Sequence, residues 1–167
     1  MDITLILLGA VLVTYGWYWG GITESRTTAY ALGVGALLLG LTFAFTGGGG
    51  DVIGGSWWAY GAIFAFLAAA NAWNESSQDR TYGMFALLFA VAAFFGFMYF
   101  SDNDAPGQYT LSALLLVATF FLHFISAGLV ADNRGFKATV GWLTLAVGFV
   151  LVYFGFADAL GNGLDPM

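Results

Sequence analysis

Residues 81–100, TYGMFALLFAVAAFFGFMYF, form an unbroken apolar stretch without a charged side chain. A helix of roughly 20 mainly apolar residues crosses about 30 Å of hydrocarbon, so this stretch predicts a transmembrane helix. Further stretches of the same kind lie at about 3–20, 28–46, 56–74, 109–131 and 138–160. The polar segments between them are short, so we expect six transmembrane helices in which consecutive helices are antiparallel neighbours.

The composition of the whole chain also favours a membrane protein. Its 167 residues are 60% hydrophobic and only 8% charged, whereas soluble domains contain about 25% charged residues. The absence of cysteine excludes disulfides and sulfur-based metal sites, and a single histidine, His123, excludes haem held by two histidines of one chain. A net charge of −6 argues against a nucleic-acid partner. The first stretch begins at Ile3 with no basic region before it, so we expect a retained helix rather than a signal peptide.

The basic residues all fall in alternate polar segments. Arg26 lies in the first segment, Arg80 in the third, and Arg134 and Lys137 in the fifth. Basic loops stay in the cytoplasm during membrane insertion. We therefore expect a multi-pass protein of the cytoplasmic (inner) membrane with both termini outside.

The three arginines are also equally spaced. Arg80 follows Arg26 by 54 residues, and Arg134 follows Arg80 by 54 again. Such a period predicts an internal repeat. We therefore expect an all-α membrane domain over 1–167, built as three two-helix hairpins around a pore, with coincidence among helices of similar length as the alternative. The hairpins and tail would occupy about 1–50, 51–104, 105–160 and 161–167.

Polar side chains inside the apolar stretches are costly in hydrocarbon unless they face protein or water. Asn71 and Asn74 are three residues apart, and Thr119, His123 and Ser126 follow at spacings of four and three, so each set predicts one helix face. These faces could line a pore or bond neighbouring helices. The predicted pore-lining polar residues are Tyr15, Asn71, Asn74, Thr119 and His123.

His123 has three possible roles. It can be a neutral imidazole bonded to a neighbouring helix, or it can line a pore for a small polar solute; a metal site is disfavoured because no histidine or carboxylate partner is near in sequence. A pore of Asn, Thr, Ser and His without buried charge suits an uncharged solute, because ions call for charged rings or carbonyl filters.

Other residue types in the stretches predict packing and membrane contacts. Gly33, Gly35 and Gly40 predict a closely packed helix over 28–46. The tryptophans near the ends of the stretches predict an aromatic belt at the membrane interface; they are Trp17, Trp19, Trp57, Trp58 and Trp73.

The chain offers little for catalysis or cofactor binding. Hydroxyl groups without an adjacent base do not make a nucleophile, and no Walker, GxGxxG or HExxH pattern is present. The glycine run Gly47–Gly50 has no preceding strand and no following lysine, so it predicts a loop rather than a phosphate site. We expect neither an enzyme nor a bound cofactor or metal.

Several segments resemble the urea/amide channel family of the AmiS/UreI type. They are residues 5–16, LILLGAVLVTYG; Thr28-Ala-Tyr30; residues 63–66, IFAF, with Asn74; and residues 142–146, WLTLA. The resemblance implies a passive channel for urea or short-chain amides, assembled as a hexameric ring with one pore per protomer. By the same resemblance, apolar side chains would narrow the pore at Met1, Leu5, Leu12, Phe64 and Leu116.

The chain also departs from that family's pattern. The family's fifth-helix tryptophans correspond to Leu116, Thr119 and His123, a helix-3 tyrosine to Ala68, and a helix-6 carboxylate of acid-gated members to Val147. The pore could therefore be wider or serve another solute. In that family, activation by acid goes with histidines in the outer loops. The outer loops of this chain contain no histidine, so we expect no activation of solute flux between pH 7 and pH 5.

Two functions from different classes follow. The first is a channel through which small uncharged polar solutes, urea or short-chain amides above all, diffuse passively. The second is a structural accessory subunit of a larger membrane complex, without a pore of its own. A proton-coupled transporter is disfavoured, because the apolar stretches lack a central carboxylate for a relay.

Overall fold

The computed structural model describes residues 2–46, 52–75, 79–103 and 105–161, and side chains of the third helix from Ala59 onward. All regular structure in this part is helical, which confirms the expected all-α class and the six helices. They are α1 (Asp2–Trp19), α2 (Ser25–Thr46), α3 (Val52–Trp73), α4 (Asp79–Asp102), α5 (Gly107–His123) and α6 (Arg134–Ala159); a π-helical segment, η2 (Phe124–Leu129), directly continues α5.

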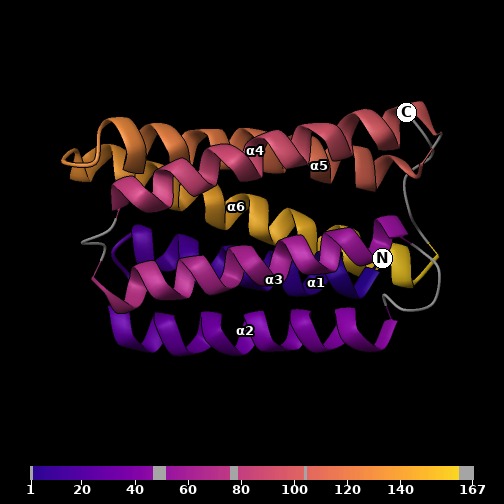
Figure 1. The fold of residues 1–167 in the computed structure, drawn as a ribbon, viewed down its shortest axis with the longest axis horizontal. Coiled ribbons are helices and arrows are strands. Elements are labelled where there is room, and N and C mark those ends of the chain that lie inside the picture. Colours follow the sequence, from indigo (N-terminus) through magenta and orange to yellow (C-terminus); the bar gives the residue numbers. More distant parts are fainter. Residues whose placement is uncertain (1, 47–51, 76–78, 104, 162–167) are drawn as a thin grey trace.

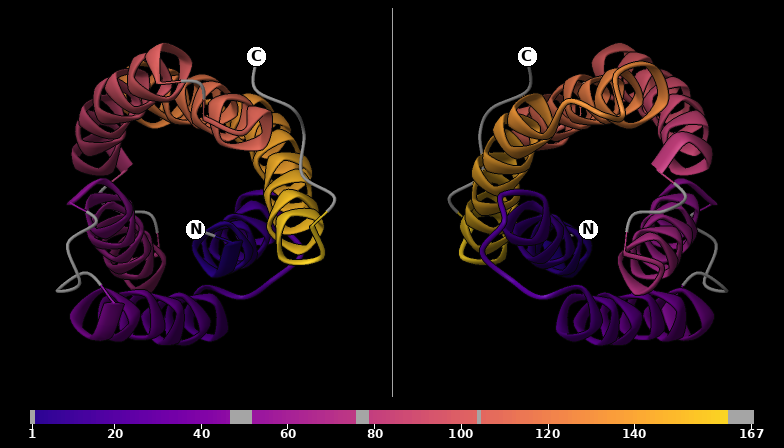
Figure 2. Two further views of the ribbon diagram at one scale, coloured as in Figure 1. Left: turned by 90° about the vertical axis from the view of Figure 1, so that its right-hand side faces the viewer. Right: turned by 90° about the vertical axis from the view of Figure 1, so that its left-hand side faces the viewer.

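Consecutive helices run in opposite directions along the long axis of the molecule (Figure 1), and they form a ring when seen from either end (Figure 2). Helix α2 packs along α3, α4 along α5, and α6 along α1, so the last helix closes the ring against the first. The first residue of α1 and the last residue of α6 lie at the same end of the bundle (Figure 1).

The three equally spaced arginines occupy equivalent places at the other end. Arg26 and Arg80 are the second residues of α2 and α4, and Arg134 is the first residue of α6. All three are exposed. We call this end, where the chain passes from α1 to α2, from α3 to α4 and from η2 to α6 (Figure 1), the basic end.

The even helices begin earlier than the apolar stretches suggest, and they include the expected loop residues Asp79, Arg80 and Arg134–Lys137. In α6, the Asn133 side chain accepts a hydrogen bond from the Phe136 backbone N–H at 3.0 Å. Such a cap pairs a donor that the first helical turn leaves free. Capping thus starts the helix ahead of its first apolar residue.

Glycines allow α1 and α6 to approach closely. A Cβ atom at Gly148 would lie 2.7 Å from the Gly9 carbonyl oxygen, and one at Gly16 would lie 2.7 Å from the Gly141 carbonyl oxygen. Small residues at such crossings bring two backbones into contact. These four glycines bring the backbones of the first and last helices of the ring together.

The expected close packing of α2 is present along α3, but the role expected of its glycines is largely wrong. Only Gly35 is tightly packed, since a Cβ atom there would lie 2.7 Å from Val11 Cγ2; Gly33 and Gly40 face open space. The outer side of α2 carries exposed apolar side chains, including Leu37, which is 60% exposed, and Phe45, which is 85% exposed. That side is suited to lipid contact.

The described helices are those of a multi-pass membrane protein. Ser25–Phe45, Asp79–Asp102, Gly107–Leu129 and Arg134–Ala159 are each long and apolar enough to span a bilayer. Ile3–Trp19 and Ala59–Trp73 are apolar but shorter within the part that the structure describes.

Candidate functional site

Polar side chains from five of the helices meet inside the ring near the basic end. They come from the last turns of α1, α3 and α5, from the first turn of α4 and from the first three turns of α6. We call this group the polar cluster; its members are Tyr15, Trp19, Asn71, Asp79, Tyr82, His123, Lys137 and Thr144. Three of the predicted pore-lining residues, Tyr15, Asn71 and His123, belong to it.

His123 is the best-partnered member of the polar cluster. It is fully buried, its Nε2 lies 2.7 Å from Thr144 Oγ1, and its Nδ1 lies 3.1 Å from the Tyr82 hydroxyl. The Thr144 hydroxyl donates to the Val140 carbonyl at 2.8 Å, so it can only accept from His123. Nε2 therefore carries the proton, and Nδ1 accepts from Tyr82. This neutral tautomer leaves both ring nitrogens paired.

A second chain of contacts links four helices. The Asn71 Nδ2 group donates to the Tyr15 hydroxyl at 2.9 Å and to Asp79 Oδ1 at 3.0 Å. The second carboxylate oxygen of Asp79 is 2.5 Å from Lys137 Nζ. The positive and negative charges of this pair cancel, so the polar cluster as a whole is neutral.

Trp19 covers the polar cluster rather than joining an interfacial belt. It is only 4% exposed, its ring centre lies 4.2 Å from that of His123, and Lys137 Nζ lies 5.0 Å from the centre of its ring. A cation over an aromatic face is attracted by the ring's negative charge density. The belt prediction is therefore wrong for Trp19, whereas Trp17 and Trp73 are exposed at 39% and 53%; the side chains of Trp57 and Trp58 lie outside the described part.

Two predicted pore-lining residues do not join the polar cluster. Asn74 is exposed, and its amide donates to the Ala70 carbonyl of its own helix at 2.8 Å. The expected common face of Asn71 and Asn74 is therefore wrong, because α3 ends at Trp73. Thr119 is buried, but its hydroxyl donates to the Leu115 carbonyl one turn earlier, at 2.8 Å.

Apolar side chains fill the ring beyond the polar cluster. Leu5, Leu12, Phe64 and Leu116, four of the expected constriction residues, are buried at 6%, 0%, 0% and 0% exposure; Met1 lies outside the described residues. Phe64 packs edge-on against Phe89 and Phe120, with ring centres 5.6 Å and 4.8 Å apart.

Tyr60 completes this set of rings. Its ring packs edge-on against Phe89 and Phe120, and its hydroxyl donates to the Phe89 carbonyl at 2.6 Å. We call Tyr60, Phe64, Phe89 and Phe120 the aromatic layer. Solute moving along the ring axis would have to displace these side chains.

A smaller polar group lies toward the end opposite the basic end. Gln108 Nε2 donates to Asp158 Oδ1 at 2.6 Å, and the Tyr109 hydroxyl donates to the other oxygen of the same carboxylate. The aromatic layer thus has polar side chains on both sides. Within the described residues, no group of three or more histidine, aspartate or glutamate side chains is placed to hold a metal ion.

Several members of the polar cluster escape a search for polar residues inside apolar stretches. Asp79 and Lys137 lie at helix starts, where the sequence predicts charged loops. Trp19 is predicted to lie at the membrane interface, and Tyr82 is counted as a hydrophobic residue. The one hint in the sequence is that Asp79 is an acidic residue directly before Arg80, one of the equally spaced arginines. Its pairing with Lys137, 58 residues away in sequence, is a tertiary contact that no local pattern contains.

Most buried polar atoms of the polar cluster are paired, but two are not. The Asn71 carbonyl oxygen and the Trp19 indole N–H have no hydrogen-bond partner. A buried polar group without a partner costs about 1–3 kcal/mol. These two atoms are therefore an unsatisfied acceptor and an unsatisfied donor within the polar cluster.

No protein-family model matches the chain, and no curated protein matches it with significant similarity. The resemblance to the urea and amide channels rests on the residues quoted for it alone.

Proposed function

We propose that this protein is a channel for passive permeation of small uncharged polar solutes, with urea and short-chain amides as the leading candidates. The observation that carries the proposal is the order of side chains inside the ring: a neutral polar cluster, an aromatic layer, and a second polar group around Asp158. Polar groups on both sides of the aromatic layer can replace some of the water that hydrates a solute before the solute enters that layer.

The aromatic layer favours neutral solutes over ions. Moving an unpaired charge from water into an apolar environment costs far more than moving a neutral amide. Phe64 and Phe120 are fully buried, so the described conformation is closed at this level, and permeation requires these side chains to move aside. A small flat solute needs a smaller displacement than a hydrated ion.

The resemblance to the AmiS/UreI type extends this proposal to the assembly. It favours a homohexamer with one pore per protomer in the cytoplasmic membrane. The placement of Arg26, Arg80 and Arg134 at one end of the bundle supports a cytoplasmic position for that end, with the first residues of α1 and the last of α6 outside. Three repeated hairpins would account for the equal spacing of these arginines.

Stopped-flow uptake into proteoliposomes tests the proposal. Purified protein should raise the permeability to urea and acetamide well above that of protein-free liposomes, with no increase for sodium or chloride. Solute uptake equal to that of the protein-free liposomes would overturn the channel.

His123→Ala tests the polar cluster within the same assay. Removal of the imidazole leaves the Tyr82 hydroxyl without its acceptor and opens space beside Tyr15, so the ratio of urea to acetamide permeability should change by roughly tenfold. Gel filtration in detergent checks that the variant keeps its fold and assembly. Unchanged permeability for urea, acetamide and water would remove His123 from the path.

A specific observation favours the second candidate function, a structural accessory subunit without a pore. The polar cluster is bonded mainly to itself, and the aromatic layer is closed. Purification from native membranes separates the two functions. A stable complex with a different protein, together with no solute uptake, would favour the accessory subunit, whereas a homomeric assembly that passes urea would exclude it.

A further inference from the structure

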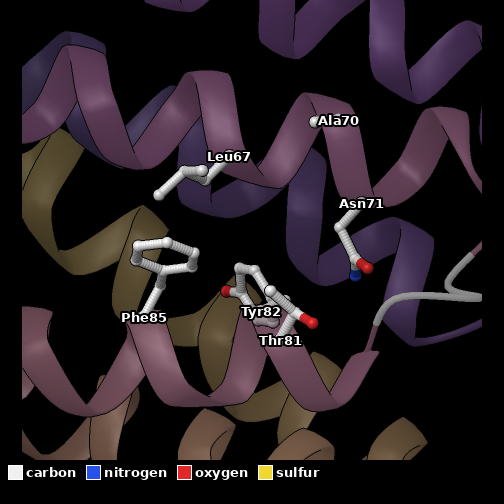
Figure 3. Close-up of a pocket in the computed structure, with 6 residues that line it drawn as sticks. All are labelled: Leu67, Ala70, Asn71, Thr81, Tyr82 and Phe85. Carbon is white, nitrogen blue, oxygen red and sulfur yellow. The ribbon is translucent and has the colours of Figure 1, made fainter.

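A small pocket lies between α3 and α4 near the basic end (Figure 3). Its volume is about 80 Å³. A single water molecule needs about 10–15 Å³, so the pocket has room for a few methylene groups. Leu67, Ala70 and Phe85 make its wall mainly apolar. The full set of lining residues is Leu67, Ala70 and Asn71 of α3 and Thr81, Tyr82 and Phe85 of α4.

The pocket opens on the outer face of α4. Its lining residues Thr81 and Phe85 are exposed. Met84 and Leu88 are exposed too, and their spacing from Thr81 places all four side chains on one face of the helix. Three of the four are apolar, so in a membrane this face is suited to lipid contact. A lipid chain is therefore the molecule most readily available to fill the pocket.

Aromatic side chains place the membrane interface about one helical turn from the pocket. Trp73, the last residue of α3, packs edge-on against Tyr30 with ring centres 5.7 Å apart, and both side chains are exposed. Exposed tryptophan and tyrosine concentrate at the level of the lipid headgroups. Ala70 lies three residues before Trp73, and three residues of helix span about 4.5 Å. The pocket therefore lies at the depth where a lipid chain begins.

Polar groups for a lipid headgroup lie at the same end of α4. Arg80 is exposed and directly precedes Thr81. Within the residues that the structure describes, the Arg80 guanidinium forms no ion pair and the Thr81 hydroxyl forms no hydrogen bond; Asp79, the other neighbour of Arg80, is paired with Lys137. A guanidinium binds phosphate oxygens through paired N–H donors, and a hydroxyl adds a further donor. Both groups are thus available to a phosphate at the mouth of the pocket.

We infer that this pocket binds a phospholipid of the leaflet at the basic end, with the first methylene groups of one acyl chain in the pocket and the phosphate at Arg80 and Thr81. The inference concerns the outer surface of the ring and does not depend on the proposed channel function. The phosphate contact selects the lipid, since an acyl chain alone is equally at home in the surrounding bilayer. The pocket in turn fixes the chain beside the arginine, which alone would hold a phosphate only weakly.

Native mass spectrometry of the purified protein in detergent tests both parts of the site with three probes. Dioleoyl phosphatidylglycerol carries both parts, dioleoylglycerol has the same chains without the phosphate, and glycerol phosphate has the phosphate without the chains. Phosphatidylglycerol should bind roughly tenfold more tightly than either partial probe. Equally tight binding of dioleoylglycerol would eliminate the phosphate contact, and equally tight binding of glycerol phosphate would reduce the site to one for free phosphate; either result would overturn the inference.

Arg80→Gln tests the headgroup contact and should weaken phosphatidylglycerol binding roughly fivefold. Arg26→Gln is the matched control, because Arg26 is also exposed and is the second residue of its helix, whereas only α3 and α4 line the pocket. Binding to Arg26→Gln should equal that of the unaltered protein. The same loss in both variants would indicate a general attraction of charge and would contradict a site at Arg80.

Ala70→Leu tests the chain contact, because it fills the pocket with a larger side chain. It should weaken phosphatidylglycerol binding roughly fivefold. Ala92→Leu is the control, since Ala92 is an exposed alanine of α4 that does not line the pocket; its binding should not change. Unchanged lipid binding by a folded Ala70→Leu protein would rule out a chain in the pocket. If that variant also lost its assembly in gel filtration, the face would belong to a contact with a second copy of the chain.

Discussion

A partly buried ion pair joins the first turns of α4 and α6. Lys137 Nζ lies 2.5 Å from Asp79 Oδ2, and the two side chains are only 17% and 11% exposed. Asp79 also stands at the start of α4, where a negative charge is favourable, while Lys137 near the start of α6 opposes the helix dipole. The lysine is therefore held there by Asp79 and by the Trp19 ring.

Asp79→Asn should destabilise the protein, because it leaves the Lys137 charge without its partner while keeping an oxygen that can accept from Asn71. A fully buried charge that loses its partner costs about 3–5 kcal/mol, and the residual exposure of both groups reduces this to roughly 2 kcal/mol. The measurement is the temperature at which the protein loses its folded, monodisperse form in detergent.

The double variant Asp79→Asn with Lys137→Met provides the control for that result. Removing both charges should recover part of the loss, since no unpaired charge remains. Strictly additive losses in the two single variants and the double variant would show that the two charges do not interact.

The tautomer of His123 gives a second prediction at this scale. Thr144→Val removes the acceptor of the Nε2 proton and should cost about 1–3 kcal/mol of stability. Thr119→Val is a matched control, because Thr119 is a buried threonine whose hydroxyl donates only to the Leu115 carbonyl; its cost should be below about 1 kcal/mol. Equal losses in the two variants would contradict the assigned bond.

The protonated ring nitrogen can also be observed directly. The chain contains one histidine, so ¹⁵N-histidine labelling gives the signals of a single ring. Long-range ¹H–¹⁵N spectra should show the proton on Nε2 in the unaltered protein. A proton on Nδ1 would reverse the direction of the Tyr82 and Thr144 hydrogen bonds.

At the scale of helices, the contact between α1 and α6 closes the ring. Gly148→Ala should weaken it, because the added Cβ atom would lie 2.7 Å from the Gly9 carbonyl oxygen and from the Val13 backbone nitrogen. Backbone atoms cannot rotate away, so the helices must separate, at a cost of roughly 1–3 kcal/mol. The readout is thermal stability in detergent.

Gly40→Ala is the control in α2. An added Cβ atom there meets no atom within 4 Å, and alanine is favoured over glycine inside a helix by about 0.5–1 kcal/mol. This variant should therefore be as stable as the unaltered protein or slightly more stable. Equal destabilisation by both substitutions would show that the α1–α6 contact is not special.

The same helices show what sequence periodicity can and cannot predict. Each of the six helices is evident from its apolar stretch, because hydrocarbon demands a continuous apolar segment. Which glycines are in contact is not evident: Gly33 and Gly40 of α2 face open space, and Gly9 and Gly148, which meet where α1 and α6 cross, are 139 residues apart in sequence. That contact depends on how the helices are ordered around the ring.

Polar residues inside the apolar stretches likewise reveal only part of the buried polar cluster. Tyr15, Asn71 and His123 are correctly singled out as buried polar groups, because such groups are rare and costly in apolar stretches. Asn74 is not buried, since it lies just past the last residue of α3. Asp79 and Lys137 are overlooked because a helix start in a loop-like, charged segment gives no apolar signal.

For the whole molecule, the decisive feature is the aromatic layer that crosses the ring. Phe64 belongs to α3, Phe89 to α4 and Phe120 to α5, so three helices supply its phenylalanine rings. The polar cluster lies on one side of it and the Asp158 group on the other. If solute moves along the axis, this layer sets both its rate and its size limit.

Phe120→Ala should therefore open the middle of the ring. Phe120 is fully buried, and its ring contacts those of Phe64, Phe89 and Tyr60. Loss of the ring should raise urea permeability in proteoliposomes by roughly tenfold, which corresponds to about 1.4 kcal/mol off the barrier, and should admit larger amides. The deletion also costs about 3–5 kcal/mol of stability, so gel filtration must first show a folded protein.

Phe121→Ala removes the same ring one residue later on α5, from a side chain that is 49% exposed on the outer surface. Its permeability should match that of the unaltered protein, because lipid or a neighbouring protomer replaces the lost ring without changing the axis. A folded Phe120→Ala protein with unchanged permeability would show that solute avoids the aromatic layer. Permeation would then have to follow a path outside the ring axis.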